Sequence, residues 1–396
     1  MKTVYTFAVL FLIVAVSGFA QAPVDSILVS YQRHFIRANL GEKANVLSDA
    51  KTDDRAGDFI GPLYEFALRF VLDNASLFRD DGDMSNLVQL SLSGIREQGY
   101  APAAETLWRA FRVFPDNGTK IDVLDTLAAV DQGLAERLNR LLEEQNGFFR
   151  SALAPNYPVL RALVSLLGNA GNESSYAALF EALLLPYNDD FLLNIENAIA
   201  SLGAARGDLG TFLVKTVLSG SLPEKEAAFR FGLRQNISAE EKAALAEAVL
   251  ETVSNAAEYS GERGRELRFL AARIIRELKW THALPLAVRY FYLAERAYQS
   301  DRSGSGNKAE LLEAIRCLAA MESMDAAVVL SLNLNLANSR MEFSGEYDAD
   351  ITVALIQALG GLQYKASYDS LNYVDFLSYP EDIKNSAREA LKRLNW

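Results

Sequence analysis

The sequence predicts an all-α fold, a right-handed α-solenoid of about eight stacked helical hairpins with helical caps at its ends. Three observations predict it. Apolar residues recur at the i, i+3, i+4, i+7 spacing of amphipathic helices over most of the chain. These helical stripes come in pairs, separated by short polar breaks with small residues. Strand signals are scarce, because threonine is infrequent and no tight turn joins two alternating runs.

Residues 1–22 predict a secretory signal peptide. Their sequence, MKTVYTFAVLFLIVAVSGFAQA, has one lysine, then an apolar stretch from Val4 to Val16, then small residues that end in an Ala-Gln-Ala cleavage motif at Ala22. The alternative is an uncleaved inner-membrane anchor through residues 4–20, but this run is shorter than the roughly 20 residues of a spanning helix. We therefore expect cleavage near Ala22 and a periplasmic or secreted product without stable membrane insertion.

The composition indicates the compartment of the protein and excludes one class of partner. Half of the residues are hydrophobic, enough for a large core, and Cys317 is the single cysteine, so no intrachain disulfide can form. A disulfide-free exported helical protein suits the bacterial periplasm. The formal net charge of −12 and the lack of long basic runs argue against nucleic acid as a partner. No cofactor is indicated.

After the signal peptide we expect an N-terminal helical cap over residues 23–84. Two helical stripes, DSILVSYQRHFIRAN and GPLYEFALRFVLDNASLF, are separated there by the polar stretch SDAKTDDRAGD. The repeat array follows over residues 85–379. We expect residues 380–396 to form a C-terminal capping helix, with Pro380 at its start and Lys392 in its last turn, where a cation interacts favourably with the helix dipole.

Within the array, a Leu or Ile lies at the end of the first helix of each hairpin, and we call this residue the anchor of the hairpin. Glycine follows three of these anchors directly, at Gly168, Gly203 and Gly360, and we expect it to end the helix in the left-handed conformation. Small residues recur in the helix that follows, as a close crossing of two helices requires. The anchors, 31 to 45 residues apart, are Ile95, Leu127, Leu167, Leu202, Leu233, Leu278, Leu318 and Leu359.

The pattern of an anchor with glycine, a short turn and Ala-x-x-Leu resembles HEAT-type helical repeats. The nearest matches are AIASLGAARGDLGTFLVKTVL, at residues 198–218, and ALIQALGGLQYKASYDSLNYV, at residues 354–374, and the resemblance covers roughly residues 85–396. It implies stacked hairpins whose second helices line a concave binding face. The family's first-helix proline and Asp-Arg ladder are not consistently present. Tetratricopeptide repeats are the rival, but their stricter period of 34 residues is not kept.

The segment VLSLNLNLAN, residues 329–338, alternates apolar and polar residues with the period of two that is typical of a strand. The repeat frame places a helix there. Leu330, Leu334 and Ala337 also share one helical face, so we expect a helix.

No catalytic constellation is visible, and we expect a protein that is not an enzyme. The two histidines, His34 and His282, form no ligand pair and one cysteine gives no thiolate cluster, so no metal site is predicted. Ser48 and Lys51 match the S-x-x-K motif of acyl-serine enzymes, but its companion motifs are absent. Nothing singles out a catalytic pair among the 51 acidic residues.

The candidate partner-binding residues are aromatic and basic. Arg289, Tyr292 and Arg296 lie at i, i+3, i+7 in LPLAVRYFYLAERAYQ, residues 284–299, and Tyr373 is the fourth candidate. Tyrosine and arginine are enriched at recognition surfaces. The alternative is that these tyrosines pack between hairpins with solvated hydroxyl groups. The buried stripe expected on the other face of this helix consists of Leu284, Val288, Phe291 and Tyr298.

We therefore expect a non-catalytic exported scaffold that binds a protein or peptide of the cell envelope on its concave face. The alternative is a cell-envelope glycan-active enzyme or glycan-binding protein on an α/α-toroid or helical superhelix, since these folds are also built of helical hairpins. Two acids that face each other across a central cleft would favour the enzyme. An open arc with its acids spread over the surface would favour the scaffold.

Overall fold

A computed structural model describes residues 26–53, 57, 60–76, 81–255, 261–302 and 304–395. The predicted signal peptide, with its cleavage site at Ala22, lies outside the described residues. Over the residues that are described, no helix is long and apolar enough to cross a membrane.

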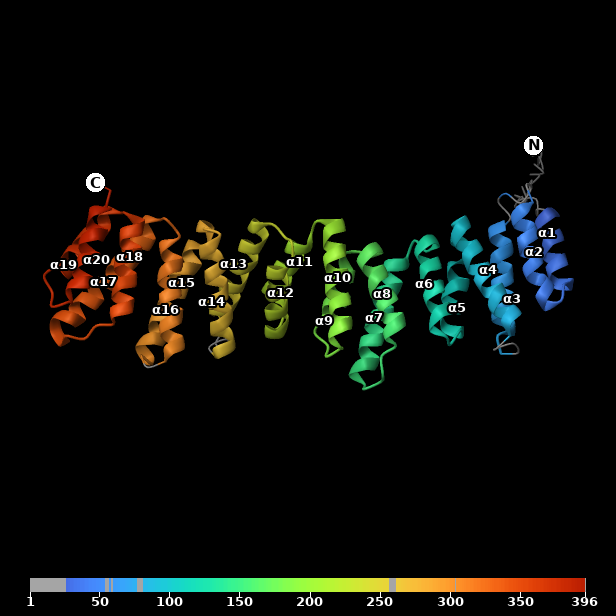
Figure 1. Cartoon of the computed structure of the whole chain (residues 1–396), viewed down its shortest axis with the longest axis horizontal. Helices are drawn as coiled ribbons and strands as arrows, with labels where there is room; N and C mark the ends of the chain where they lie inside the picture. Colours follow the sequence, from blue (N-terminus) through green and yellow to red (C-terminus); the bar gives the residue numbers. More distant parts are fainter. Residues whose placement is uncertain are drawn as a thin grey trace, which may run out of the picture. The chain divides into compact units, whose positions relative to one another are not determined.

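The described part of the chain is helical, and it divides into two compact units, residues 1–171 and residues 172–396. Within each unit the helices follow one another in chain order (Figure 1). The described residues contain no strand beyond the isolated bridge between Tyr364 and Asn395. The predicted all-α, solenoid-like fold class is therefore confirmed.

The first unit consists of two layers of alternating helices. The odd-numbered helices α1, α3 and α5 contact one another in turn, and so do the even-numbered helices α2, α4, α6 and α8. The pairs α3–α4, α5–α6 and α7–α8 hold the layers together. Its helices are α1 (Ser26–Arg37), α2 (Leu40–Thr52), α3 (Ile60–Asn74), α4 (Gly82–Gln98), α5 (Ala104–Val113), α6 (Asn117–Val130), α7 (Leu134–Arg150) and α8 (Tyr157–Ala170).

The second unit repeats this arrangement. Each odd-numbered helix from α11 to α19 contacts the next odd-numbered one, and α14, α16, α18 and α20 form the other layer. Its helices are α9 (Glu173–Leu183), α10 (Asp189–Arg206), α11 (Leu209–Ser219), α12 (Leu222–Arg234), α13 (Ala239–Asn255), α14 (Glu262–Glu277), α15 (Leu284–Ser300), α16 (Ser305–Ala319), α17 (Met324–Ser344), α18 (Ala349–Leu362), α19 (Tyr368–Val374) and α20 (Glu381–Lys392).

The eight anchors fall at the ends of the even-numbered helices from α4 to α18. Seven lie in the last turns of their helix, and Leu278 is the residue that follows α14. An odd-numbered helix follows each anchor, and we call these helices, α5 to α19, the second helices. Helix α17 includes residues 329–338, so the expectation of a helix there is confirmed.

The expected role of the anchor glycines is wrong. Gly168, Gly203 and Gly360 lie inside α8, α10 and α18, and none of them has a positive φ. Two of them instead allow close packing. A Cβ on Gly203 would lie 2.7 Å from the Cβ of Leu209, and one on Gly360 would lie 2.8 Å from the Cβ of Ala390. Glycine is needed there because another helix approaches, not because the helix ends.

A recurring turn joins the first helix to the second helix in three of the hairpins. In each copy a residue with positive φ ends the first helix, an aromatic residue follows, and a 3₁₀ turn leads to a small residue with no exposed surface. Such a buried small residue lets the second helix start close to the first one. The three copies are Gly99-Tyr100-Ala103, Lys279-Trp280-Ala283 and Gln363-Tyr364-Ser367. Because they occur in both units, the copies support an internal repeat.

Candidate binding surfaces on the second helices

Three of the four predicted site residues share one exposed face of α15. Arg289, Tyr292 and Arg296 are all exposed, and Tyr292 retains 46% of its surface while its ring edge contacts Phe291 at 5.7 Å between centroids. The expected core stripe of this helix is correct at Phe291 and Tyr298, whereas Leu284 and Val288 are only half-buried. The residues that α15 buries are Ala287, Tyr290, Phe291, Ala294 and Tyr298.

Tyr373, the fourth predicted residue, lies on α19 rather than beside the other three. Its phenol is partly exposed and donates a hydrogen bond to Glu342 of α17, which raises the pKa of Tyr373. Helix α17 contacts both α15 and α19. The second helices therefore place the four candidates in one layer, with α17 between the two groups.

An apolar stripe on α17 itself was not predicted from the sequence. Leu332 and Leu336 keep 55% and 52% of their surface exposed, whereas Leu330 and Leu334 are fully buried. The alternation that imitates a strand thus distributes leucines around the whole helix. That distribution is the sequence signal of the exposed stripe, because a helix with leucines on opposite faces normally buries both of them. The exposed stripe, one residue per turn, consists of Met324, Val328, Leu332 and Leu336.

A cavity of about 440 Å³ lies beside this stripe, between α15 and α17 over α16 and α18. Its apolar wall includes Phe291, Leu336 and Leu355. Glu295 and Arg340 also line it, and burial raises the pKa of the Glu295 carboxyl group although the charge of Arg340 opposes this shift. The cavity has the size and the mixed lining of sites that take an apolar side chain with a polar neighbour.

Asp348 lines this cavity and lies in the loop between α17 and α18, which it holds in place. It accepts a hydrogen bond of 2.8 Å from the Tyr298 hydroxyl group and lies 2.9 Å from the Lys308 ammonium group. Burial acts to raise the pKa of Asp348, but the hydrogen bonds from Lys308 and Tyr298 outweigh it and the pKa is lowered. The carboxylate is therefore charged at neutral pH and serves as a structural link.

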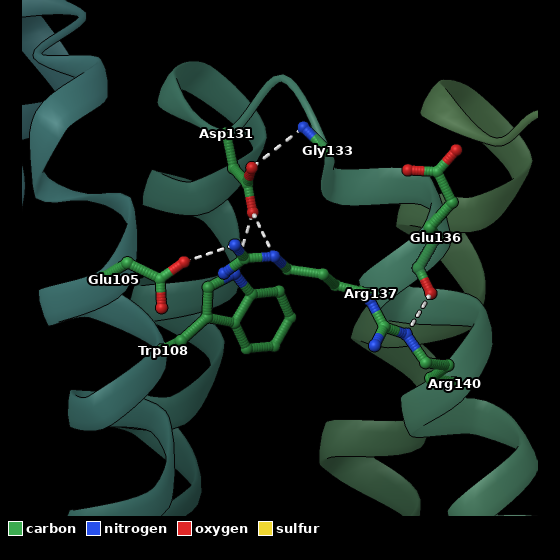
Figure 2. A network of polar contacts seen from close by, with 7 residues as sticks. All are labelled: Glu105, Trp108, Asp131, Gly133, Glu136, Arg137 and Arg140. Atoms are coloured by element: carbon green, nitrogen blue, oxygen red, sulfur yellow. Dashed lines mark hydrogen bonds and ion pairs between the residues drawn. The ribbon is translucent and has the colours of Figure 1, made fainter.

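The first unit has a second candidate surface, a groove of about 610 Å³ between α5 and α7. Figure 2 shows its central network, in which Trp108 and Glu105 project from α5 towards Arg137 of α7. The Trp108 indole N–H donates a hydrogen bond of 2.7 Å to Asp131, whose other oxygen accepts one from the Gly133 backbone N–H at 2.9 Å. Asp131 therefore fixes the ring at the end of α6.

Arg137 is fixed over the face of this ring. Its guanidinium carbon lies 5.8 Å from the Trp108 ring centroid, and its nitrogens pair with Glu105 and, at 3.7 Å, with Asp131. The hydrogen bond to Glu105 raises the pKa of Arg137. A cation that is held by an aromatic face and two carboxylates has little freedom, so this part of the groove is preorganised.

The described residues include no group of three or more His, Cys, Asp or Glu side chains that could hold a metal ion. His34 is exposed, and His282 lies 2.9 Å from Glu247. Burial raises the pKa of the Cys317 thiol to about 12. That thiol is therefore protonated at neutral pH and is not a nucleophile.

No family model matches the chain, and no curated protein matches it. Among solved structures, the chain is similar to a chain of the "Crystal complex of SYS-1/POP-1 at 2.5A resolution", with 10% identity and a TM-score of 0.33. The similarity covers 94% of this chain and 73% of that chain. A likeness this distant carries no information on function, and the resemblance to HEAT-type repeats stays a prediction.

Proposed function

We propose that the chain is a non-catalytic scaffold, exported to the bacterial periplasm, that binds a protein or peptide segment on the face of its second helices. The observation that carries the proposal is the exposed apolar stripe of α17, Met324, Val328, Leu332 and Leu336. Four large apolar side chains at successive turns are costly to leave in water, and such stripes mark interaction sites. Apolar side chains spaced by four residues are the pattern with which one helix docks on another surface.

The neighbouring helices add groups that suit a protein partner. Arg289, Tyr292 and Arg296 are exposed on α15, and Tyr373 is partly exposed on α19, on either side of the stripe in the same layer. The cavity between α15 and α17 offers a pocket for a side chain of the partner. An apolar centre with arginine and tyrosine at its margin is the usual composition of a protein interface.

Site-specific photo-crosslinking in cells tests the proposal. A benzophenone amino acid at position 332 is expected to capture one or a few envelope proteins. The same amino acid at Gln357, an exposed residue on α18 in the other layer, is the matched control and should capture none of them. The Arg289→Ala/Tyr292→Ala/Arg296→Ala variant should lower the yield of the captured proteins by about tenfold or more, because removing hot-spot residues costs several kcal/mol.

Two outcomes contradict this proposal. Equal capture from positions 332 and 357 would mean that the second helices are not the binding face. Capture of glycan fragments at position 332, with release of sugars from peptidoglycan by the purified protein, would favour the glycan-active alternative.

A further inference from the structure

The basic side chains of the groove between α5 and α7 are not all used by the network around Trp108. Arg112, Lys120, Arg137 and Arg140 line the groove, against the carboxylates of Glu105 and Glu144. Arg137 is neutralised by Glu105 and Asp131. Among the described residues, none of the other three cations forms an ion pair. The groove is therefore locally positive in a chain whose formal net charge is −12.

The free cations are partly held in position. The Lys120 ammonium group lies 5.5 Å from the Phe111 ring centroid, and Arg140 donates a hydrogen bond of 3.4 Å to the Glu136 carbonyl oxygen. Phe111 and Trp108 contact each other edge to face at 6.0 Å, so the two rings form one aromatic floor. A cation that rests on an aromatic face, as Lys120 does, loses little side-chain entropy when it pairs with a ligand.

Size and layout distinguish a segment from a small anion. The three cations come from three helices, because Arg112 lies in the last turn of α5, Lys120 lies in the first turn of α6 and Arg140 lies in α7. A volume of about 610 Å³ is within the range of pockets that bury a drug-sized ligand, so the groove has more room than one small anion needs. Leu141 and the aromatic floor supply apolar surface between the charges.

We propose that this groove binds an acidic segment of a partner protein, whose carboxylates pair with Arg112, Lys120 and Arg140 and whose apolar side chain packs on the floor of Trp108 and Phe111. Charge complementarity is the argument, since an acidic ligand is repelled by the chain as a whole and attracted at this groove. The inference needs neither export nor the apolar stripe of α17.

Fluorescence anisotropy on the purified chain from residue 23 onward tests the inference. The probe is a short, end-capped, fluorescent peptide with two acidic residues on each side of a phenylalanine, and the control probe has Asn and Gln in place of Asp and Glu. We expect binding of the acidic probe at low ionic strength, at least tenfold weaker binding of the amide probe, and a steep loss of affinity as salt is added.

Matched variants locate the binding. Lys120→Gln/Arg140→Gln is expected to weaken binding of the acidic probe by about tenfold or more. Arg33→Gln/Arg161→Gln removes the same charge from two exposed positions of the first unit and should leave the affinity unchanged. The changed side chains of the groove variant are on or near the surface, so circular dichroism melting should be unaltered.

The result that overturns the inference is equal binding of the acidic and amide probes, no binding of either, or equal affinity of the two double variants. An oligogalacturonate of matched charge that binds as tightly as the peptide would also overturn it, since the groove would then be a general polyanion site. Leu332→Ser/Leu336→Ser, which removes two of the four residues of the apolar stripe, should bind the acidic probe as the unaltered chain does. Failure of the scaffold proposal is therefore distinguishable from failure of this one.

Discussion

Arg268 and Glu310 form a buried ion pair between α14 and α16 that shows what single residues do in this fold. Their nearest atoms are 2.9 Å apart, and the side chains are 4% and 1% exposed. Burial raises the pKa of Glu310, and the positive charge of Arg268 opposes that shift. The carboxylate therefore depends on its partner, and removing either residue leaves a charge inside the protein.

Glu310→Ala is expected to destabilise the second unit by about 3–5 kcal/mol, because the Arg268 guanidinium group keeps its desolvation cost and loses its counter-charge. The measurement is urea unfolding followed by circular dichroism. Arg268→Met/Glu310→Leu removes both charges and fills the space, so it should recover most of the loss. A double variant as unstable as the single one would show that the pair itself, rather than the stranded charge, holds the helices together.

At the scale of elements, Gly360 and Gly361 are neighbours in α18 with opposite surroundings. A Cβ on Gly360 would lie 2.8 Å from the Cβ of Ala390 and 3.0 Å from its Cα, whereas one on Gly361 has nothing within 4 Å. The close approach is to a backbone, which cannot rotate away. Gly360 therefore sets the distance between α18 and α20.

We expect Gly360→Ala to lower the free energy of unfolding by about 1–3 kcal/mol, because α20 must move outward. Gly361→Ala is the matched control, and it should be neutral or stabilise the chain by up to about 1 kcal/mol, since alanine favours a helix over glycine. Thermal and urea unfolding of both variants checks this pair. Equal effects from the two substitutions would argue against a close helix crossing at Gly360.

A helix could be predicted from the sequence where its signal lies in residues that are close together along the chain. The anchors and the helix over residues 329–338 were predictable, because helical periodicity is a property of neighbouring residues. Helix α2 was missed, since the expected polar stretch begins inside it and its buried face includes a lysine, Lys43, and two alanines. A local signal was present there, because Asn39 and Glu42 form a capping box that starts a helix.

The anchor glycines and the groove could not be predicted in the same way. Gly360 is explained by its contact with α20, a helix that begins more than 20 residues later. Neither the sequence of α18 nor that of α20 shows which residues of the two helices will meet. The groove likewise gathers Arg112, Lys120 and Arg140 from three helices, although the sequence has no long basic run. Charge patterns along a chain reveal runs, whereas this patch forms only when α5, α6 and α7 come together in the folded chain.

At the scale of the whole molecule, net charge and local charge serve different purposes. The formal charge of −12 disfavours the binding of polyanions in general. A positive groove on such a chain is selective, since an acidic ligand is attracted at the groove and repelled by the net charge of the chain. The apolar stripe of α17 lacks this selectivity for charge, and its preference comes from shape and from the spacing of its leucines.

Export is the property of the whole chain on which the proposed partners depend. If residues 1–22 are removed by a signal peptidase, the periplasmic protein should begin at or near Pro23, and the loss of Lys2 makes its formal charge one unit more negative. Intact-mass measurement on the periplasmic fraction of a producing bacterium checks this expectation. Ala22→Arg places a large cation at the cleavage motif and should leave the full-length precursor in the membrane fraction. Full-length protein in the membrane without any substitution would favour the uncleaved anchor, and full-length protein in the cytosol would contradict export itself.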